Sequence, residues 1–239
     1  MTRIDGRTKD APRQVRITPG YLDFAEGSAL IESGQTKVIC AATIEERVPG
    51  FLRGSKSGWV TAEYSMLPRS TLTRTPRDTG GSPGGRASEI QRLIGRSLRA
   101  ATDLSALGER TVILDCDVLQ ADGGTRTAAI TGAYVALYQA LHRLVRQGVL
   151  PSVPLKCAVA AISVGVVDEE LLLDLCYEED ARAQVDFNVV MTDRGEYVEL
   201  QGTAEGAPFS PETSDRILAL AGKGIDYLLR VQHEAVEGV

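Results

Sequence analysis

Gln120-Ala-Asp-Gly-Gly-Thr-Arg-Thr127 joins a strand-like run to a long helical run through two glycines and an arginine. The residues before it, 112–119, alternate as a strand does, and residues 125–147 have the apolar spacing of a helix. Glycine adopts backbone angles that other residues avoid, so Gly123 and Gly124 favour a tight turn. The amides of this turn and of the first helical turn can converge on an anion, which the helix dipole also favours.

The side chains after the glycines separate two interpretations of this turn. A tight strand-to-helix connection with a threonine cap is the simpler one, and glycine-rich turns of this kind are common. Arg126, however, lies at the start of the helix, where its charge opposes the macrodipole and does not stabilise the helix. A guanidinium suits an anion at that place, and Thr125 adds a hydroxyl. The sequence therefore predicts an anion site.

Strand-like and helical runs alternate in the same order in both halves of the chain. The first half has strand-like runs that suggest an antiparallel meander and a helical run, at 14–18, 28–32, 37–47, 59–67 and 87–102. The second half has four strand-like runs and a helix that begins at Ser210-Pro211, the strands lying at 156–167, 171–177, 184–192 and 197–203. We predict a duplicated β-then-α unit with a break near residue 150, within one α+β domain over residues 1–239.

Length and composition limit the class of protein. The chain has 239 residues, of which 43% are hydrophobic, enough to bury a sizeable core. Residues 1–8 lack an apolar signal core, and no run approaches the ~20 apolar residues of a membrane span. We therefore expect a cytoplasmic protein with no membrane partner. Only His142 and His233 supply imidazoles, which argues against a Ser-His-Asp hydrolase, a Cys-His nucleophile and a histidine-rich metal centre.

Charge is distributed unevenly along a chain whose net charge is −6. The segment from Arg47 to Arg99 contains ten basic residues and three acids, a net charge of +7. The segment from Asp168 to Glu199 contains eleven acids and two arginines, a net charge of −9. A basic surface can hold a polyanion while an acidic pocket recruits a divalent cation, and a phosphodiester substrate uses both. Two unrelated solvated faces are the alternative interpretation.

Two carboxylates in the acidic half are candidate metal ligands. Asp186 lies in a strand-like run, where its apolar neighbours point to the opposite face, and a hairpin can bring Asp180 back beside it. Two carboxylates with several waters and phosphate oxygens suit Mg²⁺. Solvated turn acids are an equally weighted interpretation, because Glu178 and Glu179 have that character.

Five segments closely resemble the bacterial ribonuclease PH family, and together they span nearly the whole chain: Gly58–Arg69, Glu89–Arg96, Leu114–Arg126, Asn188–Thr192 and Glu199–Gly206. The resemblance implies the duplicated fold of the ribosomal protein S5 domain 2-like class. It also implies a phosphate-dependent 3′-to-5′ exoribonuclease that trims tRNA precursors, releases nucleoside 5′-diphosphates and runs in reverse from diphosphates. The partners it implies are RNA rather than DNA, Mg²⁺, inorganic phosphate and a homohexamer built as a trimer of dimers.

The resemblance also assigns roles to individual residues. Arg86, Gly124, Thr125 and Arg126 match the orthophosphate site, and Asp180 and Asp186 match the metal-binding and acid-base carboxylates, so that Arg126, Asp180 and Asp186 are the expected catalytic residues. Arg69, Arg74 and Arg77 resemble arginines of a loop that reaches across a subunit interface toward RNA, with a solvated loop as the alternative. Asn188 stands where the related polynucleotide phosphorylases carry a lysine, which favours tRNA trimming.

Two other classes of protein stay open at this point. One is a non-catalytic RNA-binding subunit of an exosome-like ring, although such subunits typically lose the phosphate arginine or the aspartates that this chain retains. The other is a hydrolytic nuclease, which needs no second anion site. The glycine-rich segment 79–85 reads as a mobile loop that leads to Arg86, with no assigned role.

Overall fold

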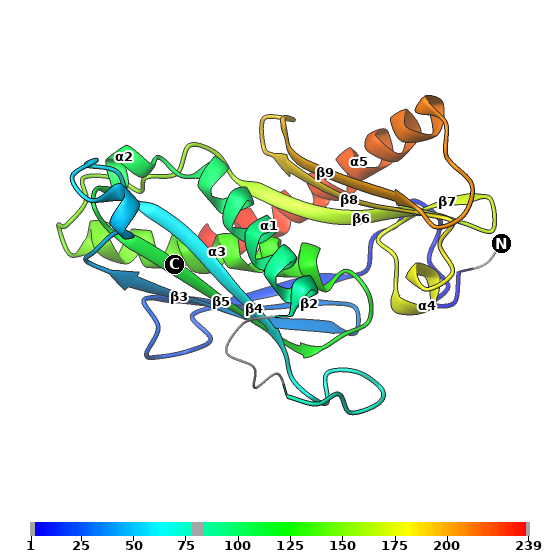
Figure 1. Cartoon of the computed structure of the whole chain (residues 1–239), viewed down its shortest axis with the longest axis horizontal. Coiled ribbons are helices and arrows are strands. Elements are labelled where there is room, and N and C mark those ends of the chain that lie inside the picture. The colour runs from blue at the N-terminus through cyan, green and yellow to red at the C-terminus, as the bar shows by residue number, and fades with distance from the viewer. Residues whose placement is uncertain (1–2, 78–83, 238–239) are drawn as a thin grey trace.

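A computed structural model describes residues 3–77 and 84–237. The first half contains, in chain order, β1 (Val15–Pro19), β2 (Gly27–Ser33), β3 (Thr36–Glu45), the 3₁₀ turn η1 (Gly50–Leu52), β4 (Trp59–Met66), α1 (Gly85–Ala101), α2 (Leu104–Leu107), β5 (Thr111–Gln120) and α3 (Thr125–Arg146). The second half contains β6 (Val159–Val167), β7 (Glu170–Leu173), α4 (Tyr177–Asp180), β8 (Val185–Thr192), β9 (Tyr197–Ala204) and α5 (Pro211–Glu237). The predicted α+β fold with a repeated β-then-α unit is confirmed (Figure 1).

The first sheet departs from the predicted meander at its fourth strand. Its order is β1-β2-β3-β5-β4, so β1, β2 and β3 form the antiparallel meander while β4 lies at the edge. β5 pairs antiparallel with β3 and parallel with β4. A parallel neighbour requires a crossover connection rather than a tight hairpin, and α1 with α2 supplies it. This crossover places the first turn of α1 near the end of β4.

The second sheet has the order β7-β6-β8-β9 and is antiparallel throughout. The prediction that its second strand extends to residue 177 is wrong, because β7 ends at Leu173 and Asp174 has a left-handed backbone, with φ of 56°. The chain then forms α4, a short helix that the sequence pattern did not reveal. This helix ends at Asp180, which returns the chain toward β8.

Helix α3 connects the two sheets. It packs against β2 and β3 of the first sheet and against β6 of the second, and its residues from Thr127 to Leu137 are all buried. A helix that is buried on every side belongs to the interior of a fold, so α3 is amphipathic only in its C-terminal part. One buried hydrophobic cluster includes residues of both sheets and of α1, α3 and α5.

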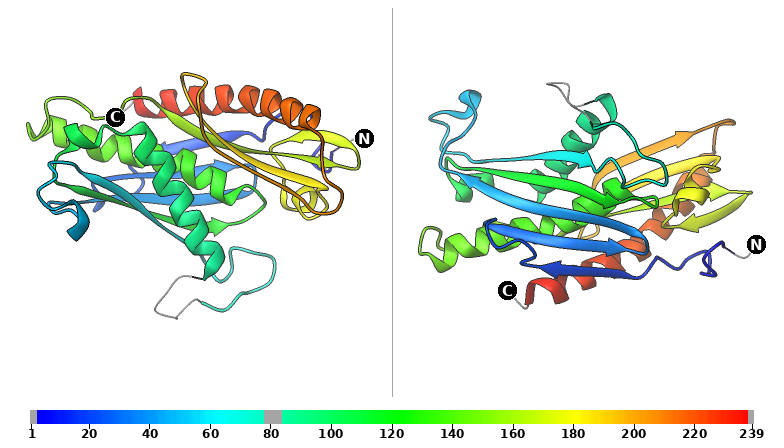
Figure 2. Two further views of the ribbon diagram at one scale, coloured as in Figure 1. Left: turned by 45° about the horizontal axis from the view of Figure 1, so that its top comes forward. Right: turned by 90° about the horizontal axis from the view of Figure 1, so that it is seen from below.

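Two segments outside the sheets matter for the site. The N-terminal segment runs along the molecule to the end at which β7 and α4 lie (Figure 1). The segment that follows β4 forms a loop that projects away from both sheets (Figure 2). Residues 79–83 of the predicted mobile glycine-rich loop lie outside the described residues, and α1 begins at Gly85, which puts Arg86 in its first turn.

Candidate active site

The glycine turn before α3 adopts the conformation that its sequence predicts. Gly123 and Gly124 both have left-handed backbones, with φ of 74° and 62°. A Cβ atom on Gly123 would lie 2.5 Å from the carbonyl oxygen of Leu175, so the turn packs closely on the segment that leads to α4. This contact joins the two halves of the chain next to the start of α3.

Thr125 does not cap the helix, which argues against the simpler interpretation of this turn. The N-cap residue is Gly124, and no side chain makes a cap hydrogen bond there. The hydroxyl of Thr125 instead hydrogen bonds the buried hydroxyl of Tyr64, with 2.8 Å between the two oxygens. Tyr64 was not identified from the sequence, because its position in β4 reads only as a core strand residue.

A cavity of about 400 Å³ contains the predicted phosphate and carboxylate residues. They come from four elements and line the cavity together: Arg86 of α1, Gly124 before α3, Thr125 and Arg126 of α3, Asp180 of α4 and Asp186 of β8. Its walls also include Gly123 and Asn188, and residues that sequence reasoning did not assign to a site, namely Met66, Thr71, Leu72, Thr73, Ala121, Ser163 and Tyr177. The cavity therefore lies between the two halves of the fold.

Both arginines of the cavity lie in first turns of helices. The Arg126 side chain is 19% exposed, and its Nη1 atom lies 3.5 Å from Oε1 of Gln201 and 3.8 Å from Oε1 of Glu89. Arg86 is exposed, in the first turn of α1. The N-terminus of a helix carries a partial positive charge, which adds to the charge of these guanidinium groups. This side of the cavity thus attracts anions.

The carboxylates of Asp180 and Asp186 also line the cavity. Burial raises the pKa of Asp186 to about 6, and the neighbouring charge of Asp180 adds to this effect. Burial also raises the pKa of the Asp180 carboxyl, although the residue as a whole is exposed. The charges of Arg126 and Arg86 oppose both shifts, so the two arginines act electrostatically on both carboxylates.

The surroundings of Asp186 fit a divalent cation. Its Oδ2 atom accepts a 3.4 Å hydrogen bond from Asn188, whereas Oδ1 is buried and has no hydrogen-bond partner within the described residues. A buried anionic oxygen beside a second carboxylate is costly unless it is paired, and a cation pairs both. Within residues 3–77 and 84–237 no group of three or more histidine, cysteine, aspartate or glutamate side chains could hold a metal. Mg²⁺ can complete two carboxylates with waters and phosphate oxygens, so the donor set suits it.

The raised pKa of Asp186 predicts a pH effect on stability in the absence of metal. The folded chain holds this proton with a pKa of about 6, whereas the unfolded value is 3.8. The free energy of unfolding of the wild type, measured relative to Asp186→Asn, should therefore fall as the pH rises from about 4 to about 6, by about 1–2 kcal/mol after allowance for solvent screening. Urea unfolding of both proteins across this range measures the difference. A difference that does not change with pH would contradict the assigned environment of Asp186.

Two sets of residues that were interpreted from the sequence do not line the cavity. Arg69, Arg74 and Arg77 are exposed in the projecting loop after β4 and do not line the cavity, although Thr71, Leu72 and Thr73 of the same loop do. The interpretation of Glu179 as a solvated turn acid is wrong. Its side chain is 2% exposed and pairs with Arg3, with 2.6 Å between Oε2 and Nη2.

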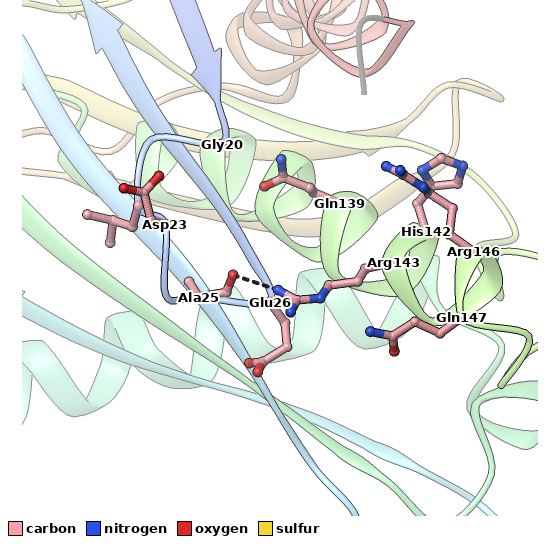
Figure 3. Close-up of a pocket in the computed structure, with 10 residues that line it drawn as sticks. Gly20, Asp23, Ala25, Glu26, Gln139, His142, Arg143, Arg146 and Gln147 are labelled. Atoms are coloured by element: carbon pink, nitrogen blue, oxygen red, sulfur yellow. Dashed lines mark hydrogen bonds between the residues drawn. The ribbon is translucent and has the colours of Figure 1, made fainter.

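A second, larger cavity, of about 550 Å³, lies at the C-terminal part of α3, far along the helix from the glycine turn (Figure 3). Arg143, which donates to the carbonyl oxygen of Ala25, and Arg146 line this cavity together with Asp23 and Glu26. The opposite charges balance, and arginines near a helix C-terminus stabilise the helix in any case. The described lining of this cavity therefore has no excess of positive charge.

Comparisons with known proteins match both halves of the chain. Residues 11–142 match the model of the 3′ exoribonuclease family, domain 1, and residues 157–224 match domain 2 of the same family. Ribonuclease PH of Dehalococcoides mccartyi (strain ATCC BAA-2100) is 58% identical over 233 residues, which are 97% of each chain. Ribonuclease PH of Syntrophomonas wolfei is also 58% identical, over 97% of this chain and 98% of its own length. In fold, a structure of the Archaeoglobus fulgidus exosome with RNA bound to the active site has a TM-score of 0.82 at 24% identity, over 95% of this chain and 91% of that one.

The chain belongs to the 3′ exoribonuclease family. Its similarity to ribonuclease PH over nearly its full length confirms the resemblance found in the sequence. It also confirms the predicted class of activity, a phosphate-dependent 3′-to-5′ exoribonuclease. No helix in the described part of the chain is long and apolar enough to cross a membrane.

Proposed function

We propose that this protein trims the 3′ ends of tRNA precursors in the cytoplasm and that orthophosphate bound at the glycine turn is the attacking group. The observation that carries the proposal is one cavity that is lined by the glycine turn, two arginines and a pair of carboxylates. A nuclease that used water as its nucleophile would need a site for the scissile phosphate only. An anion site in addition to the carboxylates that would hold a metal at the scissile phosphate favours phosphorolysis.

The orthophosphate site uses backbone and side chains together. The amide of Gly124 and the hydroxyl of Thr125 contact one side of the anion, and the guanidinium groups of Arg86 and Arg126 neutralise its charge. Tyr64 holds the Thr125 hydroxyl in place through the 2.8 Å hydrogen bond. Preorganised donors of this kind stabilise charge without reorganisation during the reaction.

The reaction exchanges one bond to phosphorus for another. An oxygen of hydrogen phosphate forms a bond to the phosphorus of the last phosphodiester, in line with the bond from that phosphorus to the 3′ oxygen of the preceding nucleotide, which breaks. The products are a nucleoside 5′-diphosphate and an RNA with a free 3′ hydroxyl. The proton that the attacking phosphate loses balances the one that the 3′ oxygen gains, and we assign its transfer to Asp186. The reverse reaction adds a nucleotide from a diphosphate.

Asp180 and Asp186 would hold Mg²⁺ in this enzyme. The metal would supply charge stabilisation at the phosphoryl oxygens and at the leaving 3′ oxygen. The chain itself contributes the buried Oδ1 atom of Asp186 and the carboxylate of Asp180, which also lines the cavity. Asn188 orients Asp186 through its 3.4 Å hydrogen bond to Oδ2.

Arg69, Arg74 and Arg77 are proposed to contact RNA held by a neighbouring subunit of a homohexamer, a trimer of dimers. Two features support this role: the loop projects from the body of the chain, and its arginines are exposed rather than directed at their own cavity (Figure 2). A positively charged loop at a distance from the reaction increases affinity for the RNA backbone without changing the chemistry.

Replacing Arg69, Arg74 and Arg77 together by alanine should weaken tRNA binding and leave the KM for orthophosphate unchanged. Each lost phosphate contact should reduce the slope of log affinity against log salt by about 0.7. Filter binding at several salt concentrations measures this slope, and a triple alanine variant of the exposed residues Arg16, Arg143 and Arg146 is the matched control. An equal loss of affinity in the control variant would contradict a specific role for the loop.

One assay tests the proposed function against its alternatives. The protein is incubated with a tRNA that carries extra 3′ nucleotides, with and without orthophosphate, and the released nucleotides are identified. Nucleoside diphosphates that are released only in the presence of phosphate support phosphorolysis. Monophosphates released without it indicate a hydrolytic nuclease, and binding without release indicates a non-catalytic ring subunit. Either of the last two outcomes overturns the proposal.

A further inference from the structure

Arg13 hydrogen bonds the backbone of the glycine turn but does not line the cavity. Arg13 is 5% exposed, and its Nη1 atom donates to the carbonyl oxygen of Asp122 at 2.5 Å and to that of Gly123 at 3.5 Å. Its Nε and Nη2 atoms donate to the two carboxylate oxygens of Asp174, at 2.9 and 2.6 Å. A bidentate pair of this kind fixes the plane of the guanidinium group.

Thr36, at the start of β3, makes a second contact behind the turn. This residue is fully buried. Its Oγ1 atom donates to the carbonyl oxygen of Gly123 at 2.7 Å and accepts from the backbone N–H of Asp122 at 2.9 Å. Arg13 and Thr36 therefore share the carbonyl of Gly123, and neither residue contacts the proposed ligands.

These contacts determine where the turn directs its amides. In a planar trans peptide the C=O and N–H groups point in opposite directions. Because Thr36 and Arg13 hold the carbonyl of Gly123, the N–H of Gly124 points away from both residues, and Gly124 is one of the residues that line the cavity. Because both glycines can adopt many backbone angles, the turn has no conformational preference strong enough to fix this orientation by itself.

The same ion pair connects the turn with the segment that carries a carboxylate. Asp174 precedes α4, and its carbonyl oxygen accepts from Arg3, which also pairs with Glu179 of α4. The backbone N–H of Tyr177, at the start of α4, donates to the carboxylate of Asp122 at 3.2 Å. The contacts that hold the glycine turn and those that hold α4, the helix that ends in Asp180, therefore share Asp122 and Asp174.

We infer that Arg13 and Thr36 are positioning residues that orient the Gly123–Gly124 peptide so that the Gly124 amide can donate to orthophosphate. The inference rests on the proposed function of the cavity as a phosphorolytic site. It assigns Arg13 and Thr36 no contact with substrate. Their effect on the reaction passes through the backbone of the turn.

The experiment compares Thr36→Val with Thr36→Ser. Valine has nearly the shape of threonine and leaves the Arg13–Asp174 pair intact but removes the hydroxyl, whereas serine keeps it. Thr36→Val should raise the KM for orthophosphate about tenfold, with little change in kcat at saturating phosphate or in the KM for RNA, and Thr36→Ser should restore the wild-type KM. Steady-state kinetics with separate titrations of phosphate and RNA measure the two KM values.

Thr111→Val is the matched control. Thr111 is a buried strand residue of the same sheet, and its hydroxyl donates to the carbonyl oxygen of Arg47 at 2.7 Å, far from the turn. This variant loses a similar hydrogen bond, so its melting temperature should fall as that of Thr36→Val does, but its KM for phosphate should stay at the wild-type value. A purely structural role of Thr36 predicts the same KM for both variants, and that result overturns the inference.

Arg13→Lys provides a second, independent test. Lysine keeps a positive charge near Asp174, but one ammonium group cannot reproduce the bidentate pair and the bond to Asp122 together. The KM for phosphate should therefore rise in a folded variant, and an unchanged value contradicts the role of Arg13. An Arg126→Ala variant measured alongside distinguishes a failure of the positioning inference from a failure of the proposed function. If only Arg126→Ala changes phosphate kinetics, the positioning inference fails and the proposed function stands, whereas if neither does, the phosphate site itself is wrong.

Discussion

Arg126→Ala should lower kcat/KM for phosphorolysis by at least about a hundredfold, which corresponds to about 3 kcal/mol of lost transition-state stabilisation, by analogy with the loss of an oxyanion donor. The side chain of Arg126 is largely buried in the cavity at the N-terminus of α3. It is therefore placed to neutralise charge both on the bound phosphate and on the phosphorus that is attacked. No other described side chain of α3 can replace it, since Arg143 and Arg146 lie at the opposite end of the helix.

The measurement for Arg126 is the rate of diphosphate release at increasing orthophosphate concentration. We expect the loss to persist at saturating phosphate, because the guanidinium acts on the transition state as well as on binding. Arg126→Lys should recover only part of the activity, since an ammonium group lacks the planar fork. Arg143→Ala, at the other end of α3, is the control and should keep full activity. Full activity of Arg126→Ala at saturating phosphate would falsify the assignment.

Asp186→Asn should nearly abolish activity and remove the response to Mg²⁺. The amide keeps the size of the side chain but loses the negative charge that a divalent cation needs, and it loses the acid-base function as well. We expect at least a hundredfold decrease in kcat, on the order of the contribution of a positioned acid or base. In the wild type, Mg²⁺ should also raise the melting temperature, because a ligand that binds the folded state stabilises it.

Thermal unfolding in the presence and absence of Mg²⁺ gives a readout for Asp186 that does not depend on activity. Mg²⁺ should stabilise the wild type and fail to stabilise Asp186→Asn. Glu178→Gln is the matched control, because Glu178 is an exposed acid of α4 that does not line the cavity, and it should respond to Mg²⁺ as the wild type does. An undiminished Mg²⁺ effect on Asp186→Asn would show that the metal binds elsewhere.

The local features of the site could be predicted from the sequence because they are encoded locally. Two adjacent glycines, a hydroxyl and an arginine before a helical run specify the turn, and the structure has the left-handed backbone that these glycines allow. The proximity of Arg86 and Asp180 to this turn was inferred from the family resemblance, because neither residue is close to the turn in the sequence. The single-domain description with a break near residue 150 remains a prediction.

The features that were missed depend on partners distant in the sequence. Glu179 looks like a solvated acid until its partner is known, and that partner, Arg3, is 176 residues away. The pairing of β4 with β5 rather than with β3 is set by the crossover through α1, which alternation within the strands does not reveal. In the same way, Tyr64 reads as a core residue, and only its contact with Thr125 connects it to the site.

The central claim is that orthophosphate itself attacks the RNA, and the fate of its atoms tests this claim most directly. The protein is supplied with ³²P-labelled orthophosphate, Mg²⁺ and a tRNA with extra 3′ nucleotides, and the products are separated. We predict that the label appears in the β-phosphate of the released nucleoside diphosphates, in equal amount to the nucleotides removed, and that Arg126→Ala lowers the rate of this incorporation by at least about a hundredfold. Unlabelled nucleoside monophosphates, released at the same rate without phosphate, would contradict the account.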